Sequence, residues 1–260
     1  PSKSMKRIYL VMTLVLLSFN GFSQEKENRG EDRERIEPHG FLYGIGIGIN
    51  QEIYQDFNYR IIPLPIIGYS NEDLRVFGPF ISYDALEFGD VEFTIQAAPR
   101  FQGFDESDSF IFKNMDERKF SMDAGFGLTY QKQNWKIGVS SMFDVLGRSK
   151  GYEAKANIGR VFRYGPLFFE PSLSLSYLDD KHVDYYYGVK AHETNELTYE
   201  YKGKASLNTT LGFSVATPIF FEGFTRVAFD YTWFDKNITN SPLVDEETNL
   251  SFRLLYSRFF

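Results

Sequence analysis

An alternation of large apolar and small polar residues, with a period of two, constrains this chain more than any other feature. Between Phe120 and Tyr130, apolar side chains take every second position and alternate with Ser, Asp, Gly or Thr. A period of two places the two sets on opposite faces of a β-strand. The stretch matches the roughly 9 to 11 residues with which a tilted strand crosses a bilayer. A soluble β-sandwich would carry charged residues on its polar face, whereas this face is mostly small.

The same pattern recurs along most of the chain. It is found in 41–49, 135–143, 172–177, 207–215 and 227–233. The mean hydropathy of -0.32 and the 18% aromatic content agree with a barrel, in which lipid-facing apolar residues alternate with lumen-facing small ones. We therefore predict an all-β fold, a transmembrane antiparallel up-and-down β-barrel with a narrow lumen filled by small residues.

The strand count can be ten or twelve. Eleven candidate strands are recognised, at 41–50, 60–70, 74–84, 88–103, 119–131, 134–144, 150–163, 166–178, 201–217, 223–235 and 247–260. Single-chain bacterial barrels have an even number. If the segment with Pro63 and Pro65 belongs to a long first loop, the count is ten, because proline interrupts a ladder. A missed strand gives twelve, which we favour, and Tyr185 to Val189 is a candidate for it.

Connection lengths predict the orientation. The connections at 131–134, 164–166 and 218–223 are tight, whereas those at 103–119, 179–201 and 235–247 are long and polar. Periplasmic turns are short and extracellular loops long in outer-membrane barrels. Counting back from a last strand that ends in the periplasm, the three long connections lie outside the cell.

The beginning of the chain resembles an export signal that starts at Met5. Lys6 and Arg7 form a basic region, an apolar run of about a dozen residues follows, and Gly21 and Ser23 suit the cleavage site. That run is shorter than the roughly 20 residues of a spanning helix. We expect four segments: upstream residues 1–4, signal peptide 5–23, charged periplasmic leader 24–40 and barrel 41–260.

Composition and motifs argue against several functions. The chain has no Cys, which excludes disulfides, thiolate metal sites and a lipoprotein anchor. A net charge of -7 without a basic stripe disfavours nucleic acid as a partner. No catalytic or phosphate-binding motif occurs, so we expect a non-enzyme without a cofactor. His182, among three aspartates of a long connection, is a candidate base for hydrolysis, but a solvated charged loop is the favoured interpretation.

Charged residues of both signs fall on the predicted lumen face. We expect them to pair across a plugged or narrow interior, although a small-solute pore stays an alternative. They are Arg100, Asp123, Lys136, Asp144, Lys155, Arg226, Asp230 and Arg253.

The last strand carries a predicted assembly signal. Leu250, Phe252, Leu254, Tyr256 and Phe260 share one face, and the chain stops on an aromatic residue. The barrel-assembly machinery favours such C-termini, so we assign Tyr256 and Phe260 to that signal. Outer-membrane lipid and lipopolysaccharide are then the expected surroundings of the outward face.

Several short segments occur in an order that resembles the MipA/OmpV family of outer-membrane proteins. Besides 144–151 and 171–177, the matching positions are Pro63, Pro65, Met115, Asp116, Arg118, Tyr186, Tyr187, Gly188, Val189, Ser241 and Pro242. Asn114 stands where the family usually has glycine.

The resemblance implies a location in the bacterial outer membrane and a non-enzymatic role. In the family's namesake that role is to act as a scaffold between a lytic murein transglycosylase and a murein synthase. The resemblance implies no catalytic, cofactor or metal residue. A small-solute pore or a surface adhesin is the second interpretation, and a barrel hydrolase the third.

Overall fold

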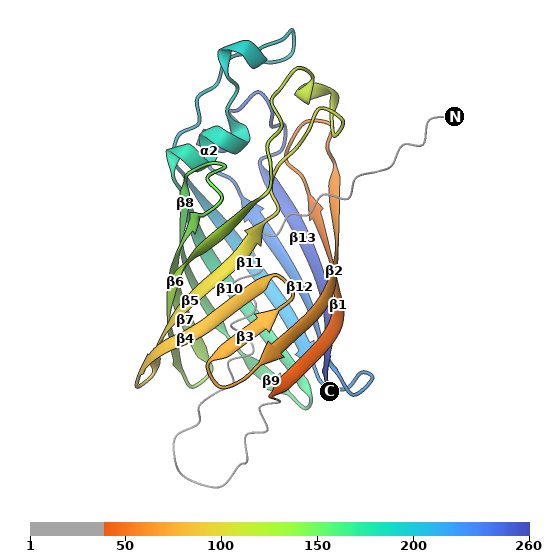
Figure 1. The fold of residues 1–260 in the computed structure, drawn as a ribbon, viewed down its shortest axis with the longest axis vertical. Helices are drawn as coiled ribbons and strands as arrows, with labels where there is room; N and C mark the ends of the chain where they lie inside the picture. Colours follow the sequence, from red (N-terminus) through yellow and green to blue (C-terminus); the bar gives the residue numbers. More distant parts are fainter. Residues whose placement is uncertain (1–38) are drawn as a thin grey trace, which may run out of the picture.

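The computed structural model describes residues 39–260, which form a closed β-barrel (Figure 1). The predicted signal peptide and nearly all of the predicted leader lie outside the described residues. The strands are β1 (Gly40–Gln51), β2 (Tyr59–Ser70), β3 (Leu74–Phe77), β4 (Phe80–Phe88), β5 (Val91–Arg100), β6 (Ser121–Lys132), β7 (Trp135–Asp144), β8 (Tyr152–Arg160), β9 (Phe162–Tyr164), β10 (Leu167–Leu178), β11 (Ser206–Thr217), β12 (Phe224–Trp233) and β13 (Thr248–Phe259).

The barrel closes because β1 pairs antiparallel with both β2 and β13, and β10 pairs with β11. Both β8 and β9 pair with β10 and are separated by Val161 alone, so they are one interrupted strand. The 13 segments of the sheet therefore make twelve strands. The prediction of twelve is confirmed, and the alternative of ten is wrong.

The interpretation of Pro63 and Pro65 as loop residues is also wrong, because both lie inside β2. Gly78 N donates to Ile67 O, so the odd-numbered residues of β2 direct their backbone groups away from β1. On that side β3 reaches only Gly68 to Ser70. Pro63 and Pro65, which lack an N–H group, therefore remove no hydrogen bond from the sheet.

The missed strand lies in the segment predicted as one strand at 74–84. This segment is the β3–β4 hairpin, which turns at Gly78, where φ is +59°. The suggested extra strand at Tyr185 to Val189 is wrong. Most of it belongs to helix α2 (Asp180–Tyr187), whose N-terminus is capped by the Asp179 side chain.

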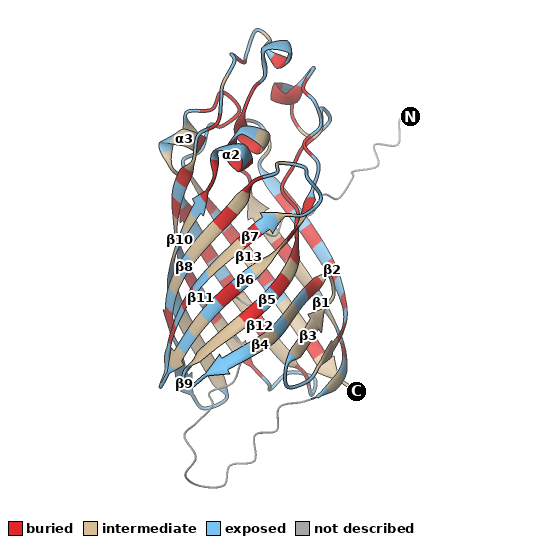
Figure 2. Cartoon of the chain, turned by 60° about the vertical axis from the view of Figure 1, so that its left-hand side comes forward, coloured by how far each residue is buried: buried red, intermediate tan, exposed pale blue. Residues whose placement is uncertain are grey.

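Two faces alternate along the strands, as Figure 2 shows by the change between buried and exposed colours. In β6, Phe126 and Leu128 are exposed on the outside, whereas Asp123 is buried on the inside. At Gly125 a Cβ atom would lie 1.9 Å from Ser141 O, so only glycine permits the observed approach of β6 and β7.

The two ends of the barrel differ. The connections 101–120, 179–205 and 234–247 gather at one end, and the tight turns lie at the other end with the C-terminus (Figure 1). The long connections contain α2, α3 (Lys236–Thr239), η2 (Phe110–Phe112) and η3 (Ala191–Glu193). No helix in residues 39–260 has the length and apolar character needed to cross a membrane.

Candidate functional site: a capped, ion-paired lumen

The long connections pack into an apolar cluster over one mouth of the barrel, which we call the cap. Tyr54 lies at its centre, with ring contacts to Phe104, Phe112 and Tyr187 at 5.3 to 5.4 Å. The Tyr54 hydroxyl donates to Tyr186 O at 2.9 Å. The buried members of the cap are Ile53, Tyr54, Phe104, Ile111, Phe112, Met115, Leu178, Val183, Tyr186, Tyr187, Val189, Ile238, Leu243 and Val244.

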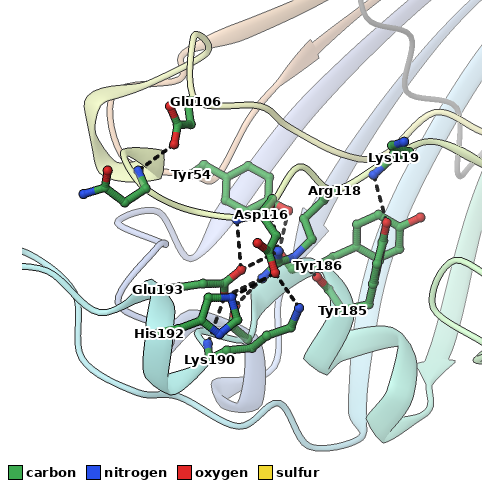
Figure 3. A network of polar contacts seen from close by, with 12 residues as sticks. Tyr54, Glu106, Asp116, Arg118, Lys119, Tyr185, Tyr186, Lys190, His192 and Glu193 are labelled. Atoms are coloured by element: carbon green, nitrogen blue, oxygen red, sulfur yellow. Dashed lines mark hydrogen bonds and ion pairs between the residues drawn. The ribbon is translucent and has the colours of Figure 1, made fainter.

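A buried ion pair joins two of these connections (Figure 3). Arg118 Nη1 and Nη2 donate to the two carboxylate oxygens of Glu193 at 2.8 Å each. Arg118 Nε also donates to Tyr185 O at 2.6 Å. Burial by itself raises the pKa of Glu193, but the bonds from Arg118 and from Lys190 N outweigh it and lower this pKa. The charges of this buried pair are compensated by each other and by further hydrogen bonds, which is required because burial removes both groups from water.

Asp116, His192 and Glu193 lie close enough together for their ligand atoms to surround a metal ion. Their hydrogen bonds argue against that use. Both Glu193 oxygens accept from Arg118, and Asp116 Oδ2 accepts from Lys190 Nζ at 2.8 Å. Hydrogen bonds from Lys190 and His192 lower the pKa of Asp116 to about 2. A cation placed here would face two fixed positive charges, so we interpret the group as an ion-pair cluster.

Below the cap, ion pairs lie on the lumen face of the wall at two levels. Near the cap, Arg100 Nη2 lies 2.8 Å from a Glu153 oxygen and also pairs with Asp123. Near the opposite end, a Glu170 oxygen lies 3.7 Å from Lys136 Nζ and 3.6 Å from Arg226 Nη2.

Arg253 pairs with Asp230 between these levels. Six of the eight residues named from the sequence form ion pairs with opposite charges, as predicted, and they are Arg100, Asp123, Lys136, Arg226, Asp230 and Arg253. The pairs Arg100–Asp123 and Asp230–Arg253 join neighbouring strands, whereas the pairs with Glu153 and Glu170 reach past one or two intervening strands. Asp144 is an exception, since it accepts from Ser121 and from the amides of Ser149 and Lys150 and so anchors a loop.

Glu153 and Glu170 were missed in the sequence, although both share the lumen-facing parity of their strands. Glu153 stands two residues before Lys155, and Glu170 two residues before Ser172. A strict count of alternate positions would have found both carboxylates.

A cavity of about 110 Å³ lies between the cap and the lower ion pairs. Its lining combines apolar surface, to which Ile53, Ile62 and Leu178 contribute, with charged side chains that include Lys155, Glu153 and Arg253. Amides and hydroxyls also contribute, among them those of Gln102, Asn208, Thr210, Thr232, Asn249 and Ser251.

His182 is not the solvated loop residue that was expected. It is 2% exposed, its ring lies 4.9 Å from that of Tyr186, and its Nε2 has no hydrogen-bond partner within residues 39–260. Asp179 uses Oδ1 for the amides of His182 and Tyr152 and does not orient the ring. Burial, together with the charge of Arg100, lowers the pKa of His182 well below its usual 6.5. No Asp–His pair suited to activating water is formed there.

The motif positions converge on the cap. Met115, Tyr186, Tyr187 and Val189 belong to its apolar cluster. Ser241 Oγ donates to Tyr187 O at 2.6 Å, and Pro242 O accepts from Gln55. Gly188 ends α2 where a Cβ would lie 2.3 Å from Asp184 O.

Asp116 and Arg118 form the ion-pair cluster of the cap, whereas Pro63 and Pro65 lie apart from it in the barrel wall. The predicted assembly residues lie at the opposite end. Phe260 N donates to Phe41 O at 3.0 Å, so the last residue takes part in closing the barrel.

Residues 43–260 match the family model described as MltA-interacting protein MipA. The chain belongs to this family. Its relatives include the outer membrane protein Omp26La of Vibrio anguillarum, 24% identical over 93% of this chain and 94% of that protein. OmpV of Vibrio cholerae is 23% identical over 93% of this chain and 94% of that protein. The MltA-interacting protein of Escherichia coli K12 is 23% identical over 79% of this chain and 84% of that protein.

These comparisons confirm the family and the outer-membrane location that the sequence predicted. The three relatives are named as outer-membrane or interacting proteins and not as enzymes. Among solved structures, the NanC porin is 9% identical with a TM-score of 0.44, over 84% of this chain and 99% of that one. That likeness is too distant to carry a functional argument.

Proposed function

We propose that this MipA-family barrel is a non-enzymatic scaffold of the outer membrane whose periplasmic end holds a murein-remodelling enzyme. The name of the MltA-interacting protein of Escherichia coli supports a transglycosylase partner. The cap closes one mouth of the barrel and ion pairs occupy the lumen, which favours binding at the outer surfaces of the molecule over conduction of solutes through it.

The observation that carries this proposal is the construction of the β11–β12 turn. Ile219, Phe220 and Phe221 are all exposed there, Phe221 to 80%. Phe221 and Glu222 adopt φ of +52° and +55°, an uncommon left-handed conformation for residues other than glycine.

Contacts from β13 hold this turn in place. The Tyr256 hydroxyl donates to Phe221 O at 2.9 Å, and Arg258 pairs with Glu222. A small apolar projection fixed on a rigid strand end suits a protein partner better than solvent. The charged leader expected at 24–40 would add a second contact on the same side of the membrane.

The experiment is crosslinking in cells, followed by purification of the barrel and detection of a lytic transglycosylase and a murein synthase. Phe221→Ser is expected to reduce recovery of the transglycosylase several-fold. Tyr164→Ser is the matched control, because Tyr164 is 78% exposed near another turn at the same end. Absence of both enzymes from the wild-type material, or equal recovery with Phe221→Ser, overturns the scaffold.

The alternative function, a small-solute pore, is favoured by the cavity inside the lumen. It requires displacement of the cap and rearrangement of the ion pairs at both levels. Steady single-channel conductance of the wild-type protein in planar bilayers would establish the pore, whereas a baseline trace agrees with the scaffold.

A further inference from the structure

The hydrogen-bonded wall of the barrel is interrupted between β2 and β5. β3 pairs with β2 only at Gly68 to Ser70, and the pairing of β4 with β5 ends at Ile81 and Ala97. Beyond these points, residues 59–66 of β2 and 98–100 of β5 face each other without an intervening strand among the described residues. Figure 1 shows β2 and β5 separated above the short β3–β4 hairpin, on the side of the cap.

Prolines occupy both edges of this gap. Pro63 and Pro65 have the parity of Ile67, whose carbonyl points away from β1. Asp90 O accepts from Gln131 N, so even-numbered residues of β5 face β6 and Pro99 faces the gap. Since proline has no N–H, a strand from another protein could not complete a ladder on either edge. The gap is therefore not a site for strand addition.

The inner face beside the gap is apolar between two buried arginines, Arg60 of β2 and Arg100 of β5, unlike most of the lumen. Ile62, Leu64 and Ile66 of β2 are buried on the inside, and Phe80 and Ala98 are buried on the flanking strands. At the corresponding positions, β6 carries Ser121, Asp123, Gly125, Gly127 and Thr129. Where the backbone ladder is missing, these apolar side chains close the wall, together with one hydrogen bond that Arg60 Nη2 donates to Gly103 O at 2.7 Å. Rotating side chains costs less than breaking a ladder of hydrogen bonds.

The lumen cavity lies directly behind this apolar closure. Ile62 of β2 and Gln102, which follows β5, both contribute to its lining and come from the two sides of the gap. The cap covers the cavity at one end, and the Lys136–Glu170–Arg226 ion pairs lie toward the other. The interrupted wall is therefore the most direct route between this cavity and the surrounding membrane.

The cavity also indicates the charge of a ligand. Glu52, Glu153 and Arg253 line it as well, but each is ion-paired, with Arg60, Arg100 and Asp230 respectively. Lys155 also lines it, and within residues 39–260 no carboxylate lies within 4.0 Å of its ammonium group. Hydroxyls and amides such as those of Thr210 and Asn208 surround the same space. A molecule with an anionic head near Lys155 and an apolar chain along Ile62 and Leu64 would match both parts of the site.

We propose that the gap between β2 and β5 is a lateral entrance, through which a single-chain amphiphile with an anionic head passes from the outer leaflet into the lumen cavity. The entrance goes beyond the scaffold role and does not depend on it, because it uses the opposite half of the barrel.

The absence of cysteine from the chain allows a clean labelling test. Leu64→Cys places a thiol on the inner face beside the gap. Ser172→Cys is the matched control, since Ser172 faces the lumen in β10 and is paired on both sides. Both variants are placed in lipid nanodiscs and exposed to a membrane-partitioned pyrene maleimide or to a water-soluble cationic methanethiosulfonate.

The membrane-partitioned reagent is expected to label Leu64→Cys at least about tenfold faster than Ser172→Cys, a difference of about 1.4 kcal/mol in barrier. The water-soluble reagent should not show this preference. Equal rates with the membrane-partitioned reagent overturn the entrance. A heat-modifiable gel shift reports folding, and Ile66→Cys on the same face replaces Leu64→Cys if the latter does not fold.

Laurate tests the ligand class. Laurate below its micellar concentration should slow labelling of Leu64→Cys, decanol should slow it less, and Lys155→Met should remove the difference between them. Equal protection by laurate and decanol would overturn the claim that the ligand has an anionic head. Absence of protection by both would overturn the claim that the cavity binds an amphiphile.

Discussion

Arg118 and Glu193 lie 75 positions apart in the chain, yet both carboxylate oxygens of Glu193 accept hydrogen bonds from the two Nη atoms of Arg118. This contact ties the β5–β6 connection to the β10–β11 connection inside the cap (Figure 3). The cap is therefore held together by specific charged contacts as well as by apolar packing.

Arg118→Met should loosen the cap and leave the barrel folded. Removing one partner leaves Glu193 buried and uncompensated, which costs about 3–5 kcal/mol of cap stability. The measurement is protease cleavage within 101–120 and 179–205, with the heat-modifiable shift as a probe of the barrel. Lys119→Met is the control, because its ion pair with Glu117 is exposed and spans 3.9 Å. Unchanged cleavage of Arg118→Met would show that apolar packing alone holds the cap.

The buried His182 should make the cap sensitive to mild acid. Its pKa in the folded protein lies well below the value of 6.5 expected after unfolding, because burial and Arg100 disfavour the charged ring. The unfolded cap therefore binds the proton more readily, and cap stability is complete above about pH 6.5 and falls as the pH decreases below it. The loss cannot exceed about 1.4 kcal/mol for each pH unit.

Hydrogen exchange of the cap amides between pH 7.5 and 5, corrected for the intrinsic pH dependence of exchange, measures this effect. His182→Gln should abolish the dependence over that range. Asp116 and Glu193 do not interfere, since their pKa values are lowered and they lose their contribution only in stronger acid. A wild-type cap that keeps the same corrected protection at pH 5 contradicts the prediction.

The barrel itself could be predicted because each strand repeats a local pattern that the lipid and the lumen impose on it. The β3–β4 hairpin was harder to predict, although Gly78-Pro79 is a dipeptide typical of turns. Gly78-Pro79 interrupts a segment whose apolar residues continue on both sides, so 74–84 resembled one strand. Pro63 and Pro65 were compatible with a strand only because β3 is too short to pair with them, which no local pattern shows.

The cap could not be predicted from periodicity, since its contacts join residues far apart in the chain. The Tyr54 hydroxyl and Tyr186 O are separated by 132 positions, and Ser109 Oγ and Gln55 O by 54. The family motifs marked many of the residues involved but not their common location. His182 shows the limit most clearly, because its charged sequence neighbours suggested solvent whereas the helix turns it inward.

The group of Asp116, His192 and Glu193 should not behave as a metal centre. Addition of zinc or of a chelator is expected to leave the melting temperature of the cap unchanged, because Lys190 and Arg118 already neutralise the carboxylates. Asp116→Asn should cost less than about 1 kcal/mol, since the pair with Lys190 is exposed. A zinc-dependent rise in melting temperature that Asp116→Asn removes would refute this interpretation.

Gly125 should be indispensable for closing the wall between β6 and β7, whereas its neighbour on the same face should tolerate a methyl group. A Cβ at Gly125 would lie 1.9 Å from the Ser141 carbonyl oxygen, which belongs to the backbone and cannot move without breaking the ladder. At Gly127 the nearest atom would be the Gln96 side-chain nitrogen, at 3.4 Å. Gly125→Ala is therefore expected to destabilise the barrel by about 1–3 kcal/mol or more, and Gly127→Ala by much less. Urea unfolding of both variants in detergent micelles, followed by tryptophan fluorescence, measures the difference, and equal midpoints would mean that the two strands can separate at Gly125 without loss.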